Sequence, residues 1–126
     1  IYSYTKDTSP KQIKNIDYYN SKIPIFDNHN IEEQLRKSLK NKSWLKSGSY
    51  LIIDHTEAMV VIDVNSGRFI GKGNHEENSL KINLEAAHEI ARQLRIRDIG
   101  GLVVIDFIDL INISNRKKVY EELKNY

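Results

Sequence analysis

The chain has 126 residues, of which 40% are hydrophobic and 29% charged, with a net charge of +2 at pH 7 and no cysteine. This balance is typical of one globular domain, or one domain and part of another, and it excludes a chain dominated by disorder. The lack of cysteine excludes disulfides, thiolate zinc sites and a cysteine nucleophile, and no apolar run approaches the roughly 18 residues of a membrane-spanning helix.

The first third of the chain is polar and weakly patterned. A short helix is expected at Lys11 to Tyr19, after a Ser-Pro breaker. The run from Lys22 to Phe26 is apolar but contains Pro24, which cannot donate to a sheet ladder, so it indicates an edge strand or an extended link. A helix is expected from about Ile31 to Lys40, because apolar residues recur there every four positions and form one stripe.

Positive charge gathers on this helix and beyond it, since no acidic residue occurs between Gln34 and Ile53. One interpretation is a solvated helix face followed by a charged loop. The other is an anchor for phosphate groups, because clustered lysine and arginine displace counterions from a nucleic-acid backbone. The basic residues of this stretch are Arg36, Lys37, Lys40, Lys42 and Lys46.

From Gly48 onward the chain alternates between β-rich and helical patterns. Tyr50–Asp54 and Ala58–Val64 are strand-like runs joined by a short turn, which is typical of a β-hairpin. An amphipathic helix is expected from about Ser79 to Arg97, and Leu102–Ile108 is predicted to be a strand buried on both faces. A last helix is expected from about Asn115 to Lys124. The apolar stripe of the long helix comprises Leu80, Leu84, Ala87, Ala91 and Leu94.

A strand–helix–strand crossover would place Ala58–Val64 and Leu102–Ile108 parallel in one sheet. We therefore expect an α/β fold whose mixed sheet combines the β-hairpin with this crossover. Asp63 and Asp106 then lie at the C-terminal ends of two strands, where open α/β sheets place ligand sites. Such a pair can share a hard cation such as Mg²⁺, and Asn65 projects to the same face as Asp63.

The acidic residues also have a structural interpretation. Asp63 is then a turn residue, and Asp106 is a strand acid with a buried partner, because an unpaired buried carboxylate is costly. Arg68 follows Asp63 closely enough to contact a phosphate. Trp44 and Tyr50 have ring faces on which bases can stack, although an aromatic residue beside a strand is more commonly packed.

Three blocks of the sequence resemble the ribonuclease E/G family in the same order. They are Thr56 to Arg68, Asn83 to Arg95 and Gly100 to Asp109. The resemblance implies an endoribonuclease that hydrolyses single-stranded RNA in RNA processing, including rRNA processing, and decay, with Mg²⁺ or Mn²⁺ as cofactor. It also implies that residues 41–126 belong to a DNase I-like catalytic subdomain and residues 1–40 to the end of an RNase H-like subdomain.

The resemblance further implies roles for individual residues. Asp63 and Asp106 match the family's two metal ligands, and Asn65 matches its catalytic asparagine. The family's S1-like domain, its 5′-end sensor and the cysteine pair of its zinc link have no counterpart in this chain. We therefore interpret the chain as a fragment of a longer protein, weakly active alone, whose full-length form is a homo-oligomer in a bacterial cytoplasm or a plastid stroma.

A second hypothesis is a non-catalytic RNA-binding or assembly module. It would keep the sheet and use the basic stretch between residues 36 and 46 as an electrostatic anchor. Dependence on a metal separates the two hypotheses, because only the enzyme requires its two aspartates to be ionised and free to bind a cation.

Overall fold

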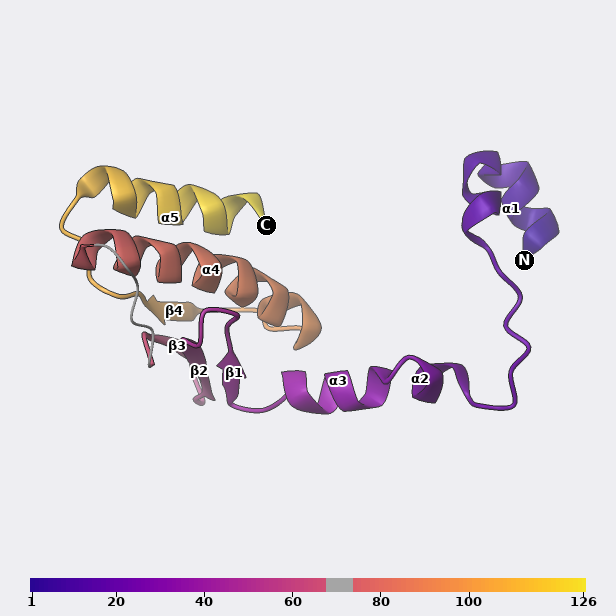
Figure 1. Ribbon diagram of the computed structural model, residues 1–126, viewed down its shortest axis with the longest axis horizontal. Coiled ribbons are helices and arrows are strands. Elements are labelled where there is room, and N and C mark those ends of the chain that lie inside the picture. Colours follow the sequence, from indigo (N-terminus) through magenta and orange to yellow (C-terminus); the bar gives the residue numbers. More distant parts are fainter. Residues whose placement is uncertain (68–73) are drawn as a thin grey trace. The chain divides into compact units, whose positions relative to one another are not determined.

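A computed structural model describes residues 1–67 and 74–126 of the chain (Figure 1). The chain divides into two compact units, Ile1–Gln34 and Leu35–Tyr126. Within the described residues, no helix has both the length and the apolar character to cross a membrane.

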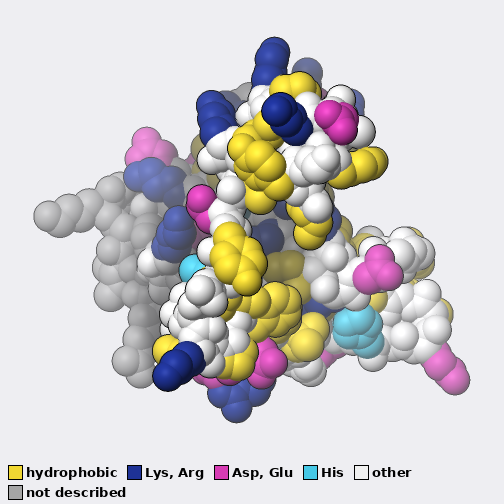
Figure 2. All heavy atoms as spheres, turned by 90° about the vertical axis from the view of Figure 1, so that its right-hand side faces the viewer, with side chains coloured by type: hydrophobic (Ala, Val, Ile, Leu, Met, Phe, Trp, Pro, Cys, Tyr) yellow, Lys and Arg dark blue, Asp and Glu magenta, His cyan; other side chains and the backbone are white. Residues whose placement is uncertain are grey.

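The first unit consists of short helices without a buried core. They are α1 (Tyr2–Thr8), the 3₁₀ helix η1 (Pro10–Asn15), α2 (Ile25–Asn28) and the beginning of α3 (Ile31–Ser38). None of the four helices has a buried residue. Figure 2 shows hydrophobic side chains at the surface beside lysine and arginine. Tyr4, Tyr18 and Phe26 are exposed residues of this unit.

Of the predictions for this unit, one was confirmed and two are met only in part. The helix expected at Lys11–Tyr19 is present only over its first part, as the 3₁₀ helix η1, and α1 before it was not predicted. The run around Pro24 forms no strand; Pro24 precedes the single turn of α2. The fixed φ of proline suits that position, and the missing N–H costs nothing there. The helix expected from Ile31 is present as α3.

The second unit is built on a four-stranded sheet in the order β1-β2-β3-β4. β1 (Lys42–Trp44), β2 (Tyr50–His55) and β3 (Val60–Asn65) are antiparallel neighbours, and β4 (Val103–Asp106) is parallel to β3. The predicted α/β fold, with its hairpin and its strand–helix–strand crossover, is confirmed. Strand β1 was not predicted, since the segment had been interpreted as a charged loop.

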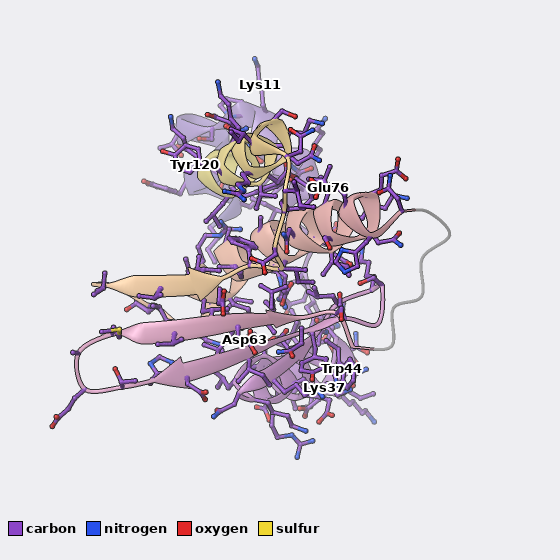
Figure 3. All side chains as sticks on the ribbon, turned by 90° about the vertical axis from the view of Figure 1, so that its left-hand side faces the viewer. Lys11, Lys37, Trp44, Asp63, Glu76 and Tyr120 are labelled. Carbon is purple, nitrogen blue, oxygen red and sulfur yellow. The ribbon has the colours of Figure 1, made fainter. Side chains whose placement is uncertain are left out.

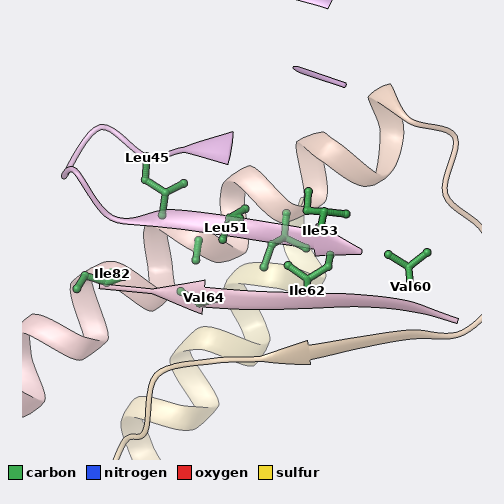
Figure 4. Packing of buried hydrophobic residues seen from close by; sticks show 9 residues of the cluster. Leu45, Leu51, Ile53, Val60, Ile62, Val64 and Ile82 are labelled. Carbon is green, nitrogen blue, oxygen red and sulfur yellow. The ribbon is translucent and has the colours of Figure 1, made fainter. Parts of the chain in front are cut away.

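The main core lies between this sheet and α4 (His75–Ile96), as Figures 3 and 4 show. Leu51, Ile53 and Ile62 from the strands and Ile90 from α4 are completely buried. The helix begins earlier than predicted because Asn74 caps it, accepting a hydrogen bond from the backbone N–H of Glu77 at 2.8 Å.

Helix α4 packs on one side against the sheet and on another against a second helix, whereas the sequence predicted a single apolar stripe. Ile82, Ala86 and Ile90 belong to the core against the sheet. A second cluster, around Ala87, joins α4 to α5 (Ile113–Asn125), and Leu84 of the predicted stripe packs against it. A helix between a sheet and another helix needs a wide apolar surface, so the stripe marked only part of it.

The opposite face of the sheet, here called the open face, carries exposed and half-buried side chains. Along β4 the exposure alternates, with Val103 and Ile105 half-buried and Val104 and Asp106 exposed. The predicted burial of this strand on both faces is therefore wrong, because α4 covers only one of them. The strand residues on the open face are Lys42, Trp44, Tyr50, Ile52, Asp54, Val61, Asp63, Asn65, Val104 and Asp106.

Candidate active site

Two aspartates stand side by side on the open face. Asp63 on β3 and Asp106 on β4 are register partners in the parallel pair, and both are exposed. Neighbouring strands lie about 4.8 Å apart, so the two carboxylates project from adjacent backbones in the same direction. The structure brings these two residues together, and Asp106 is exposed rather than buried beside a partner.

Asn65 joins the acidic pair through a direct hydrogen bond. Its side-chain Nδ2 donates to Oδ2 of Asp63 at 2.6 Å. The two residues are separated by one position on β3, so the pleat of the strand places both on the open face. The amide holds one oxygen of the carboxylate and thereby fixes the orientation of the other.

Asn83 supports the site from behind, a role that was not predicted from the sequence. It lies fully buried on α4 and bonds to the backbone of Ile108, two residues beyond Asp106. A buried asparagine within an apolar helix face is the signal that could have identified it, because such an amide requires partners. Through this contact α4 fixes the point at which the chain leaves β4.

An aromatic pair lies on the open face on β1 and β2, beside Asn65. Trp44 on β1 and Tyr50 on β2 are register partners, and Tyr50 is in turn the partner of Asn65. The ring centroids are 5.2 Å apart, with an interplanar angle of 60°. The Nζ of Lys42 lies 4.1 Å from the Trp44 centroid and 3.6 Å from the Tyr50 centroid, which are cation–π distances.

The predicted basic residues are only partly brought together. One hollow of about 560 Å³ is lined by Lys37, Lys40, Lys42 and Trp44. Arg92 of α4 lines the same hollow, although the sequence analysis gave it no such role. The lining of this hollow includes neither Arg36 nor Lys46, and Arg68 lies outside the described residues.

Glu89 of α4 fixes the edge strand beneath this hollow. Its carboxylate accepts hydrogen bonds from Arg92 Nε at 2.8 Å, Gln93 Nε2 at 2.7 Å and Ser43 Oγ at 3.1 Å. Desolvation by burial acts to raise the pKa of Glu89, but the hydrogen bonds from Arg92 and Gln93 lower it on balance. The network therefore keeps a charged carboxylate under β1.

The donor set of the site suits a hard cation. Within residues 1–67 and 74–126 no group of three or more His, Cys, Asp or Glu side chains could hold a metal. The acidic groups at this site are the two carboxylates of Asp63 and Asp106. Mg²⁺ is commonly held by one or two carboxylates and keeps its remaining positions for water and substrate phosphate. A closed site of the structural zinc type does not fit this set.

Known proteins resemble the chain along nearly its whole length. The model of the Ribonuclease E/G family matches residues 1–126. Ribonuclease G of Escherichia coli (strain K12) is 40% identical over 124 residues, which are 98% of this chain and 25% of that protein. The Ribonuclease E/G-like protein, chloroplastic, of Arabidopsis thaliana is 44% identical over 123 residues, which are 96% of this chain and 12% of that protein.

A third relative is Ribonuclease E of Escherichia coli (strain K12), which is 45% identical over 109 residues, 86% of this chain and 10% of that protein. The chain thus spans a quarter or less of the length of these relatives. The match of the family model extends over both units and includes Asp63, Asn65 and Asp106. The chain belongs to the ribonuclease E/G family.

Proposed function

We propose that this chain is part of the catalytic region of a metal-dependent endoribonuclease that hydrolyses single-stranded RNA. One observation carries the proposal: Asp63 and Asp106 are in register on neighbouring parallel strands, exposed, with Asn65 bonded to Asp63. Membership of the ribonuclease E/G family and relatives named ribonucleases support RNA as the substrate.

The three side chains divide the work. Asp63 and Asp106 bind the cation, and the cross-strand repulsion between their like charges is relieved when it is bound. When bound, Mg²⁺ supplies Lewis-acid stabilisation of the charge on the scissile phosphate and lowers the pKa of a coordinated water. Asn65 keeps the Asp63 carboxylate in its binding orientation through the 2.6 Å hydrogen bond.

The surroundings of the site suit a polyanion. Lys37, Lys40 and Lys42 line the hollow at the β1 edge of the sheet, where they attract the phosphates of the RNA strand. We extend the proposal to a role in RNA processing and decay, to a homo-oligomeric full-length protein, and to a bacterial cytoplasm or a plastid stroma. Relatives from a bacterium and from a plant, the latter named chloroplastic, support both locations.

The test uses the full-length protein that carries this chain. Asp63→Asn and Asp106→Asn are expected to reduce cleavage of a single-stranded RNA by roughly 100-fold or more, because each removes a charge from the cation site. Asp54→Asn is the matched control, since Asp54 is an exposed acid on the same face of the sheet that accepts a bond from Asn41. Cleavage by both site variants at the wild-type rate would contradict the proposal.

Metal binding is checked separately on the isotope-labelled chain. Titration with Mn²⁺ is expected to broaden the amide signals around Asp63, Asn65 and Asp106, and Asp106→Asn should abolish the broadening. Broadening centred elsewhere counts against the cation site, irrespective of any cleavage activity.

A non-catalytic RNA-binding module is the second candidate, and the basic hollow favours it. Lys37, Lys40, Lys42 and Arg92 line this hollow beside the edge strand, apart from the acidic pair. A binding module retains its affinity for RNA in chelator and after Asp63→Asn, and it cleaves nothing. Retained binding without metal-dependent cleavage in the full-length protein would therefore select this candidate.

A further inference from the structure

The open face carries a second group of side chains, next to the acidic pair, with the chemistry of a nucleobase site. We propose that Trp44, Tyr50 and Lys42 form a subsite on which a base of the single-stranded RNA stacks while its phosphate contacts the lysine. The inference rests on the proposed function, because it takes the RNA at the acidic pair as the ligand.

The sheet register places the two rings in the row of Asn65, next to the row of the acidic pair. Trp44 is the partner of Tyr50, and Tyr50 is the partner of Asn65, so the three occupy one row across β1, β2 and β3. Two strand spacings separate Trp44 from Asn65, which is about 10 Å. An RNA strand whose phosphate lies at Asp63 therefore reaches the rings with a neighbouring nucleotide.

The Trp44 ring is accessible to a base, and the Tyr50 ring beside it is half-buried. The Trp44 side chain is 63% exposed, which is unusual for the largest apolar side chain of a strand. The 60° angle between the two rings makes a shallow aromatic corner rather than a closed stack. Base–aromatic stacking needs one open ring face and tolerates any base, which suits a subsite that does not select sequence.

The subsite is held in place before any ligand arrives. Ser43, between Lys42 and Trp44, points to the other face, where its Oγ donates to Glu89 at 3.1 Å. Arg92 clamps the same carboxylate with two bonds, from Nε at 2.8 Å and Nη2 at 2.6 Å. Because the middle residue of the strand is fixed to α4, its two neighbours are fixed on the open face.

Charge identifies the occupant as a polyanion rather than as another apolar protein segment. Lys42 lies within 4.1 Å of both ring centroids, and Lys37, Lys40 and Arg92 line the hollow that Trp44 also lines. An apolar partner on Trp44 would remove water from the Lys42 ammonium beside the rings and offer it no negative charge in return. A nucleotide supplies a π face for the rings and a phosphate for the Lys42 ammonium.

The experiment combines abasic RNA with ring variants in the full-length protein, in chelator so that no metal-dependent cleavage occurs. Each base of a short single-stranded RNA is removed in turn, and Kd is measured for the wild type, Trp44→Leu and Trp44→Phe. The wild type should lose about 5- to 150-fold in affinity at one position, the range expected for one stacked base. Trp44→Leu should bind the intact RNA with an affinity lowered by a similar factor, and removing the base at that position should lower its affinity no further. Trp44→Phe keeps an aromatic ring, so its affinity should again depend on that base.

Val104→Ala is the matched control, since it removes an exposed apolar side chain from β4 on the same face. It should keep the wild-type abasic profile. Lys42→Gln should lower the slope of log Kd against log salt by about one, as expected for one lost phosphate contact. If Trp44→Leu fails to fold, Tyr50→Leu replaces it in the same set of measurements with intact and abasic RNA.

The inference is overturned if the abasic profile of Trp44→Leu, or of Tyr50→Leu in its place, equals that of the wild type. The rings then stabilise the sheet or contact another segment of the full-length protein. This outcome is distinguishable from failure of the proposed function. If Asp63→Asn abolishes cleavage but the ring variant has the wild-type abasic profile, the protein is the proposed enzyme without this subsite. If the ring variant loses the abasic effect but the full-length protein shows no metal-dependent cleavage, the subsite exists in a binding module.

Discussion

Asn83 and Ile108 exchange two hydrogen bonds, although one lies in the middle of α4 and the other beyond the end of β4. The side-chain Nδ2 of Asn83 donates to the carbonyl of Ile108 at 2.7 Å, and the N–H of Ile108 donates to Oδ1 at 3.0 Å. The amide thus replaces a strand partner for a residue that has left the sheet. The position of Asp106 depends on this contact as well as on its own strand.

Asn83→Leu should destabilise the chain by on the order of 2 to 4 kcal/mol, because it leaves a donor and an acceptor of Ile108 without partners. Asn83→Asp keeps the acceptor for the Ile108 N–H but buries a carboxylate against the Ile108 carbonyl, so at neutral pH it should destabilise the chain at least as much as leucine does. Urea denaturation followed by circular dichroism measures both. A leucine variant as stable as the wild type would show that water satisfies the Ile108 backbone equally well.

The acidic pair should carry a cost in stability when no cation is present. Like charges opposite one another on neighbouring strands are unfavourable by roughly 0.2–1 kcal/mol. Asp106→Asn is therefore expected to raise the melting temperature in chelator and to abolish the further rise that Mg²⁺ gives the wild type. Equal melting temperatures for both proteins in chelator and in Mg²⁺ would argue against a shared cation.

Glu76 should make the docking of α5 sensitive to acid. Its carboxylate accepts bonds from Asn115 Nδ2 at 2.8 Å and from the N–H of Ile111 at 2.9 Å, and these lower its pKa. A lowered folded-state pKa stabilises the fold above the pKa of the unfolded state, and the stabilisation is lost as the pH falls through the folded value. Glu76→Gln should reduce stability at about pH 7 and leave it nearly unchanged at about pH 3.

Thermal unfolding at the two pH values checks this expectation, with Glu57→Gln as the control. Glu57 lies in the exposed turn between β2 and β3. The lowered pKa of Glu89 acts in the same direction, so the glutamine variant of Glu76 should still lose some stability in acid. An unaltered pH dependence would mean that the contacts of Glu76 to the start of α5 contribute nothing.

Replacing Asp98, just after the end of α4, with glycine should make the chain more stable. The N–H of Ile99 donates to the carbonyl of Leu94 at 2.9 Å and that of Asp98 to Arg95 at 3.3 Å, which is the pattern of a Schellman cap. Asp98 occupies its left-handed position with φ of 52°. Asp98→Gly should stabilise the chain by about 1 kcal/mol, because it relieves that backbone and removes an acid from the negative end of the helix dipole.

Chemical denaturation of Asp98→Gly beside Asp98→Asn tests the two causes separately. Asparagine removes the charge but keeps the side chain, so it should give only part of the gain. A destabilised glycine variant would indicate that the greater freedom of the unfolded chain outweighs the relief.

The sheet and the acidic pair could be predicted from the sequence because their signals are local. Two β-rich runs around a short turn predict a hairpin, and a helix between two such runs predicts a parallel pair. Once Asp63 and Asp106 are assigned to the ends of those strands, the fold brings them together. No tertiary detail beyond the strand order was needed.

Strand β1 and the open face could not be predicted in this way. The segment Lys42–Trp44 is only three residues long and has no alternating apolar pattern, and it is a strand because it pairs with β2. The apolar run of β4 was predicted to be buried on both faces, but burial depends on which elements cover the sheet. The closeness of Trp44, Tyr50 and Lys42 likewise follows from pairing register, which a single strand sequence does not encode.

The parallel pairing of β3 with β4 also determines the order in which the molecule can be assembled. Asp63 and Asp106 are separated by the whole of α4, so closing that loop costs chain entropy before the strands gain any contact. The antiparallel hairpin of β2 and β3 has a much shorter loop to close and can form first. During synthesis from the N-terminus, a chain that already displays Asp63 still lacks its partner carboxylate. Any ligand that requires both acids can bind only after β4 has been made and has docked beside β3.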